Sequence, residues 1–87
     1  GFRMTVVDVF SVSGSSTVVT EAVECGEVRV KDEIFIMGKR GRLAARVDGL
    51  EKSCRTVKIA QAGDHVGVCL HKIAHTQVEQ GDVLLRD

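Results

Sequence analysis

Short apolar segments rich in β-branched residues, separated by glycine-centred turns, run through almost the whole sequence. Valine, isoleucine and threonine favour extended backbone, and glycine supplies the positive φ that tight turns need. The stretch 62–70, Ala-Gly-Asp-His-Val-Gly-Val-Cys-Leu, shows both signals, because its turn leads directly into an apolar strand. The segments expected to be strands are 4–12, 17–23, 28–37, 43–47, 66–73 and 83–85.

Several short strands at this spacing predict an all-β domain that forms a sandwich or a closed barrel. No segment sustains the 3.6-residue period of a helix, so no helix longer than about two turns is expected. A length of 87 residues predicts one domain over 1–87. The residues expected in the core are Val7, Val9, Val19, Val23, Ile34, Ile36, Leu43, Val47, Val66, Val68 and Leu84.

The first expected strand carries apolar residues on both of its faces. Val7 and Val9 share one face, and Phe10 and Val12 share the other. If the first pair faces the interior, the second pair faces outward as an exposed apolar strip, which usually marks a contact surface. Alternatively, a β-bulge near Ser11 shifts the alternation, and both pairs belong to the core.

The charges balance, with 12 Lys and Arg against 12 Asp and Glu. A net charge of zero gives no overall attraction to nucleic-acid phosphates or anionic lipids. One local cluster remains as a candidate phosphate contact, with a solvated hairpin tip as the alternative: Lys39, Arg40, Arg42 and Arg46. No apolar run reaches the length of a membrane span, and no basic-then-apolar leader is present. A cytoplasmic protein without a secretory signal is therefore expected.

The three cysteines form an odd set, which does not indicate a disulfide framework. Cys69 and His71 lie two residues apart on one face of an expected strand, and His75 follows, so a zinc site is one interpretation. It would need Cys25 or Cys54 to complete it, and no Cys-x2-Cys pair exists. Buried, reduced thiols with surface histidines are expected instead, with no metal and no cofactor. No third group orients a Cys–His pair for nucleophilic catalysis.

The sequence also carries a set of short motifs in a characteristic order. These are Phe2-Arg3-Met4, the segment 7–14, Thr17-Val18-Val19-Thr20, Gly49-Leu50-Glu51, the segment 62–68 and the segment 79–84. Together they resemble the second, β-barrel domain of elongation factor Tu and related translational GTPases. The resemblance implies a small closed six-stranded Greek-key β-barrel of the translation-factor type. No Gly-x4-Gly-Lys-Ser/Thr loop is present, so no enzyme is expected, and GTP hydrolysis would belong to another domain or chain.

The resemblance further implies a domain that packs against a GTPase domain and helps to hold the aminoacylated 3′ end of tRNA; ribosomal RNA is a further candidate partner. The contact residues carried over by position are Phe10, Val12, Gly14, Val18, Thr20, Glu51 and either Cys69 or Leu70. Ser15 stands where the family has an arginine. The alternative function is therefore a stand-alone structural protein-interaction barrel that has lost RNA binding.

Overall fold

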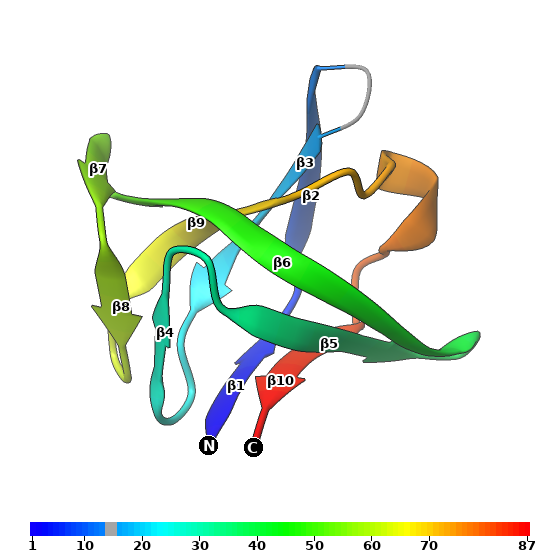
Figure 1. Ribbon diagram of the computed structural model, residues 1–87, viewed down its shortest axis with the longest axis horizontal. Coiled ribbons are helices and arrows are strands. Elements are labelled where there is room, and N and C mark those ends of the chain that lie inside the picture. Colours follow the sequence, from blue (N-terminus) through cyan, green and yellow to red (C-terminus); the bar gives the residue numbers. More distant parts are fainter. Residues whose placement is uncertain (14–15) are drawn as a thin grey trace.

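The computed structural model describes residues 1–13 and 16–87, which form ten strands and one short 3-10 helix (Figure 1). The elements are β1 (Phe2–Thr5), β2 (Asp8–Ser13), β3 (Ser16–Ala22), β4 (Glu27–Arg29), β5 (Glu33–Gly38), β6 (Gly41–Lys52), β7 (Arg55–Val57), β8 (Ile59–Gln61), β9 (His65–Leu70), η1 (His75–Gln77) and β10 (Val83–Arg86).

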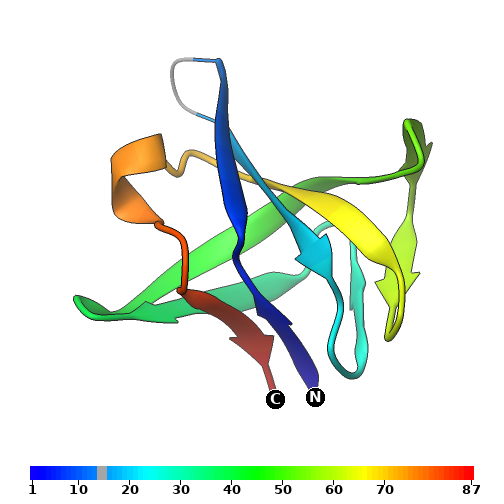
Figure 2. The ribbon, with the colours of Figure 1, turned by 180° about the vertical axis from the view of Figure 1, so that it is seen from behind.

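Most of the strands belong to one curled antiparallel sheet. Its order is β1-β10-β5-β6-β9-β3-β2, and β7 pairs with β6 beside this path. Strands β4 and β8 form a separate two-stranded ladder. Figure 2 shows β1 and β10 side by side, with the two chain ends adjacent. The predicted all-β class is confirmed, and the only helix in the described residues is the three-residue η1.

Beyond the end of β3 the chain turns back along β1. The backbone N–H of Arg3 donates to the carbonyl of Cys25 at 3.1 Å, and the N–H of Glu24 donates to the carbonyl of Arg3 at 2.8 Å. The Glu24 carboxylate accepts a bond from the Thr5 hydroxyl and one from the Arg3 guanidinium. The Thr5 bond, and after it the Arg3 contact, outweighs desolvation and lowers the pKa of Glu24. Strand β1, at one end of the sheet path, therefore lies close to the continuation of β3, which is next to last at the other end.

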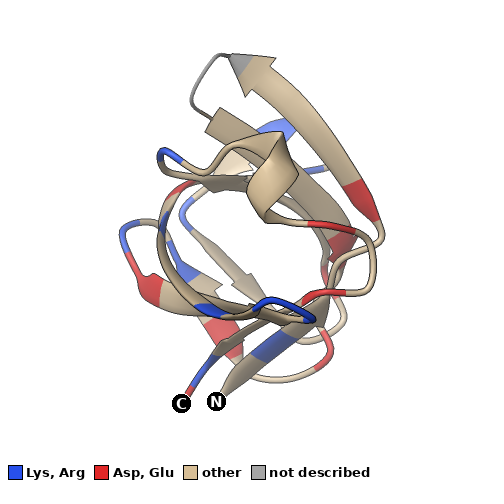
Figure 3. Cartoon of the chain, turned by 90° about the vertical axis from the view of Figure 1, so that its right-hand side faces the viewer, with Lys and Arg blue, Asp and Glu red and all other residues tan. Residues whose placement is uncertain are grey.

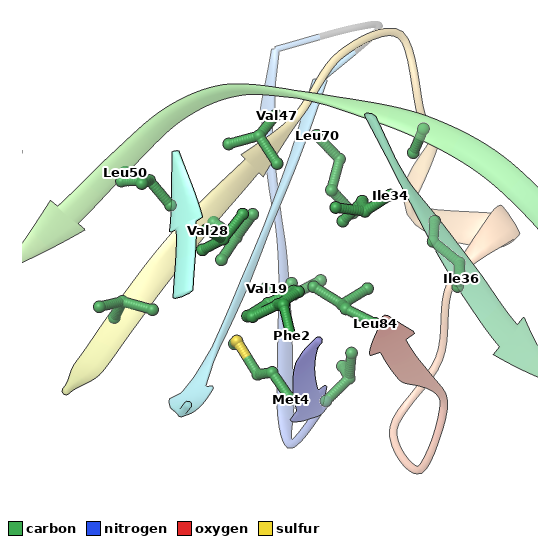
Figure 4. Packing of buried hydrophobic residues seen from close by; sticks show 14 of the residues in the cluster. Phe2, Met4, Val19, Val28, Ile34, Ile36, Val47, Leu50, Leu70 and Leu84 are labelled. Atoms are coloured by element: carbon green, nitrogen blue, oxygen red, sulfur yellow. The ribbon is translucent and has the colours of Figure 1, made fainter. Parts of the chain in front are cut away.

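The inner face of the curled sheet holds one apolar cluster to which nearly every strand contributes (Figure 4). Phe2, Met4, Leu50, Leu70 and Leu84 are among its largest members, and each is at most 1% exposed. The predicted core residues that are buried are Val19, Val23, Ile34, Ile36, Val47, Val66, Val68 and Leu84. Val9 and Leu43 are half-buried at its edge.

The prediction of a single strand over 4–12 was wrong, and so was the burial of Val7. The chain breaks between β1 and β2, where the N–H of Val6 donates to the Asp82 carbonyl and that of Val7 donates to the Thr20 carbonyl. Val6 is therefore buried, whereas Val7 is 38% exposed. Phe10 and Val12 face outward as predicted, 53% and 63% exposed.

Other strand boundaries also differ from the expectation. The segment 28–37 divides into β4 and β5, because a tight turn joins Arg29 to Asp32. The Asp32 carboxylate accepts a hydrogen bond of 2.8 Å from the Arg29 N–H, and this side-chain bond stabilises the turn. The strand expected at 43–47 extends over the whole of β6, and β7 and β8 were not predicted.

Candidate functional site

The strand register places five of the predicted contact residues in two neighbouring rows of the sheet. In one row Phe10 of β2 lies opposite Val18 of β3, Val18 opposite Cys69 of β9, and Cys69 opposite Gly49 of β6. In the other row, Thr20, Gly67 and Glu51 follow one another across β3, β9 and β6. Residues two apart on a strand share a face, so both rows lie on the same outer face of the sheet.

Two adjoining hollows open on this outer face. One, of about 320 Å³, is lined by Val12, Val18, Gly49, Leu50, Glu51, Thr56, Gly67 and Cys69. The other, of about 300 Å³, is lined by Phe10, Val18, Thr20, Glu51, Ser53, Cys54, His65, Val66 and Gly67. Because both share Val18, Glu51 and Gly67, they form one continuous surface, called here the outer hollow. Its walls are mainly apolar, and its one carboxylate is Glu51.

The two glycines in the lining create the depth of the outer hollow. A Cβ on Gly67 would lie 3.2 Å from Cγ1 of Val18, and a Cβ on Gly49 would lie 3.8 Å from Cβ of Cys69. Neither glycine has a positive φ, so its backbone is ordinary extended strand. The hollow thus exists because two outward positions on neighbouring strands carry no side chain.

Glu51 and Cys69 give the outer hollow its polar character. The Glu51 side chain is exposed and forms no ion pair with any described residue. Burial, and after it the nearby carboxylates of Asp48 and Glu51, raises the pKa of the Cys69 thiol. Cys69 therefore stays protonated near neutral pH and acts as an uncharged wall rather than as a nucleophile.

Six of the predicted contact residues line the outer hollow: Phe10, Val12, Val18, Thr20, Glu51 and Cys69. Leu70 does not, because it is fully buried in the core, on the opposite face of β9 from Cys69. Gly14 lies outside the described residues. Gly49 and Gly67 were not predicted as site positions. For Gly67 a signal was available, because this glycine lies between Val66 and Val68 in an apolar strand.

The basic cluster lies elsewhere, at the β5–β6 hairpin and along β6. Lys39 and Arg40 occupy the two-residue loop between the paired Gly38 and Gly41. Arg42 stacks on the Phe35 ring, with 4.6 Å between its guanidinium carbon and the ring centroid. Arg46 pairs with Asp48 at 3.3 Å and is therefore neutralised within the domain. Figure 3 looks onto the side with the hairpin tip and colours its Lys and Arg blue.

The prediction that the cysteine thiols are buried was wrong for two of the three. Cys25 and Cys54 are exposed rather than buried, and Cys69 is half-buried. Within residues 1–13 and 16–87, no group of three His, Cys, Asp or Glu side chains is placed to hold a metal ion. His71 instead contacts Asp48, with 2.5 Å between Nδ1 and Oδ2. None of the helical structure in the described chain has the length and apolar character needed to cross a membrane.

The described residues form a small curled all-β domain with an apolar hollow on the outer face of its sheet. Over residues 16–85 the sequence matches the family described as elongation factor Tu domain 2. The chain belongs to this family, whose members are the non-catalytic β-barrel domains of translation factors.

Solved structures agree with this assignment. The chain is similar to translation elongation factor SelB from Methanococcus maripaludis in its apo form, with 29% identity and a TM-score of 0.87. It is also similar to the same factor in complex with the GTP analogue GppNHp, with 29% identity and a TM-score of 0.86. In both cases the match covers 95% of this chain and 18% of the other chain. The chain thus spans less than a fifth of the length of these proteins.

Proposed function

We propose that the outer hollow binds the aminoacylated 3′ end of a tRNA within a translation factor. The observation that carries this proposal is the register, which brings Phe10, Val18 and Glu51 from three strands onto one exposed face. Membership in the elongation factor Tu domain 2 family supports an RNA ligand at this domain.

The chemistry of the outer hollow suits an unpaired terminal nucleotide. Phe10 is 53% exposed and offers a π face on which a base can stack. Val12 and Val18 provide apolar walls, and their contact with the base removes apolar surface from water. Glu51 supplies an acceptor for a ribose hydroxyl or a base amino group beside these walls.

A neighbouring GTPase domain is the second candidate occupant. The exposed Phe10 and Val12 side chains form an apolar strip, which also suits a protein contact. On this interpretation the domain is a structural interaction module that does not bind RNA. The observation on the side of this candidate is that Ser15 stands where the family has an arginine, which removes one basic contact for tRNA.

We further propose that the sheet closes as a six-stranded Greek-key barrel in the order β1-β10-β5-β6-β9-β3. The hydrogen bonds of Arg3 with Glu24 and Cys25 support this closure, because they join β1 to the continuation of β3. In this arrangement β2 continues β1, and no long sheet edge remains exposed. The domain serves translation in the cytoplasm, and GTP hydrolysis resides in another domain or chain.

A binding titration tests the proposal. Fluorescently labelled aminoacylated tRNA is titrated with the 87-residue chain, with Phe10→Ala and with Leu85→Ala, and binding is followed by anisotropy. Phe10→Ala is expected to weaken binding by about 1–3 kcal/mol, the range for one stacked base or one buried anchor. Leu85→Ala, half-buried on β10 away from the outer hollow, is the matched control and is expected to bind like the parent chain.

The possible results separate the candidates. Equal affinity of the parent chain and Phe10→Ala for the tRNA contradicts a tRNA end in the outer hollow. If the tRNA does not bind at all, and a separately produced GTPase domain binds the parent chain more tightly than Phe10→Ala, the outer hollow is an interdomain contact. Deacylated tRNA is titrated in the same way. If it binds as tightly as aminoacylated tRNA, the contact does not involve the aminoacyl group.

A further inference from the structure

The tip of the β5–β6 hairpin carries positive charge that the domain itself does not neutralise. Among the described residues, ion pairs occupy Arg3, Arg29, Arg46, Lys52 and Arg86. No described carboxylate forms an ion pair with Lys39, Arg40 or Arg42. A chain with no net charge thus keeps a local excess of three cations within four residues.

Both guanidinium groups of the tip are held in place by neutral contacts. Arg40 donates a hydrogen bond of 2.8 Å to the backbone carbonyl of Thr76, which docks the tip onto η1. Arg42 lies over the ring of Phe35. These contacts restrict the two side chains without cancelling their charge, so less entropy is lost when they meet an anion.

A hollow of about 230 Å³ lies between the hairpin and the end of η1, and Arg40, Arg42 and Gln77 line it. Asp82 also lines this hollow, and its Oδ2 already accepts the Glu79 N–H at 3.0 Å. A Cβ on Gly38 would collide with the same carboxylate, which therefore lies close against the hairpin backbone. An anion is accordingly expected at the rim beside the arginines rather than at the floor beside Asp82.

We propose that this hairpin tip is a second RNA-binding surface, which contacts backbone phosphates without reading sequence. Guanidinium groups match phosphate geometry in a bidentate manner, and three cations without an ion-pair partner among the described residues favour a polyanion. Phe35, which lies on β5 near the tip, is covered by Arg42 and so offers no free platform for base stacking beside the charges. The surface lies at the opposite end of β6 from the outer hollow and is independent of the function proposed for that hollow.

The test compares the RNA affinity of the parent chain with that of two double variants, each of which removes two positive charges. The 87-residue chain is titrated into a short labelled RNA single strand and its duplex at several salt concentrations. Arg40→Gln/Arg42→Gln is expected to lower affinity at least about tenfold and to reduce the salt slope by roughly 1.4 for the single strand and 1.8 for the duplex. Arg55→Gln/Lys58→Gln removes the same charge at the far end of the domain and is expected to change neither quantity appreciably.

Two further measurements complete the experiment. Arg40→Lys/Arg42→Lys keeps the charge and is expected to retain most of the binding, and thermal unfolding shows that each variant is folded. Binding of a blunt duplex separates the hairpin tip from the outer hollow, because such a duplex offers no unpaired terminal nucleotide to stack on Phe10. The proposal is overturned if the parent chain fails to bind RNA at low salt, or if both glutamine double variants lose affinity equally. It is also overturned if a polyglutamate peptide, and not RNA, binds with the expected variant dependence.

Discussion

The exposure of Phe10 predicts that its removal costs the fold far less than the removal of Phe2. Phe2 is 1% exposed in the core, and truncation of such a residue to alanine costs about 3–5 kcal/mol because a cavity remains. Phe10 is 53% exposed, so Phe10→Ala takes roughly 50–100 Å² of apolar surface out of contact. At about 25 cal/mol per Å², this loss of burial amounts to roughly 1–2.5 kcal/mol of unfolding free energy. Water fills the space that the ring leaves, so no cavity adds to this cost.

Urea unfolding followed by far-UV circular dichroism measures both variants, since the chain has no Trp or Tyr for fluorescence. A domain of this size has a total stability of roughly 5–10 kcal/mol, so Phe10→Ala stays folded while Phe2→Ala approaches its limit. The comparison uses midpoints at equal slopes, which excludes changes in the unfolded state. If Phe10→Ala proves as costly as Phe2→Ala, Phe10 belongs to the core in solution, and the argument for an outward-facing contact residue fails.

Three other perturbations have defined outcomes. Gly63 has φ +93° with nothing within 4 Å of an added Cβ, so Gly63→Val is expected to cost roughly 1–3 kcal/mol through backbone strain alone; an unchanged urea midpoint would contradict this. The buried Thr17 hydroxyl donates to the Ile73 carbonyl at 2.6 Å, so Thr17→Val is expected to cost about 1 kcal/mol in the same assay; equal or greater stability would show that the bond contributes nothing. The hydrogen bond from Lys52 lowers the pKa of Asp64 in the folded protein below its ordinary value of 3.8. The ionised Asp64 therefore stabilises the fold at any pH above 3.8, and this stabilisation is lost as the pH falls through the lower pKa of the folded state. Asp64→Asn should therefore flatten the fall of the urea midpoint in acid, and an identical acid profile would refute that role.

Local signals in the sequence located most of the strands and turns. Glycine at 63, followed directly by an apolar run, predicted the turn before β9, and Gly41 at φ +100° closes the predicted β5–β6 hairpin. The β6–β7 turn was missed, because Ser53 and Cys54 both adopt positive φ where asparagine or glycine would be the usual signal. Strands β7 and β8 are only three residues each and show no clear alternation. Strand β7 depends on pairing with β6 across this turn, and β8 depends on pairing with β4, which is far away in sequence.

The outward direction of Phe10 and Val12 was predictable from alternation, but the burial of their neighbours was not. The break at Val6–Val7 depends on two backbone bonds, to Asp82 and to Thr20, that join positions far apart in sequence. The outer hollow likewise depends on register. A register shift between Val47 and Gly49 brings Gly49 opposite Cys69, and no local pattern in β6 specifies that shift.

Because glycines form the floor of the outer hollow, the shape of this surface can change independently of the packing of the core. Gly49 and Gly67 project no side chain into the core, and both have backbone that any residue adopts. Selection or design can therefore reshape the hollow at these two positions, although a side chain at Gly67 also requires a small shift of Val18. The inward residues Leu50, Val66 and Val68 continue to hold the fold. One scaffold can in this way evolve a different ligand preference through single substitutions, without first acquiring compensating changes in its core.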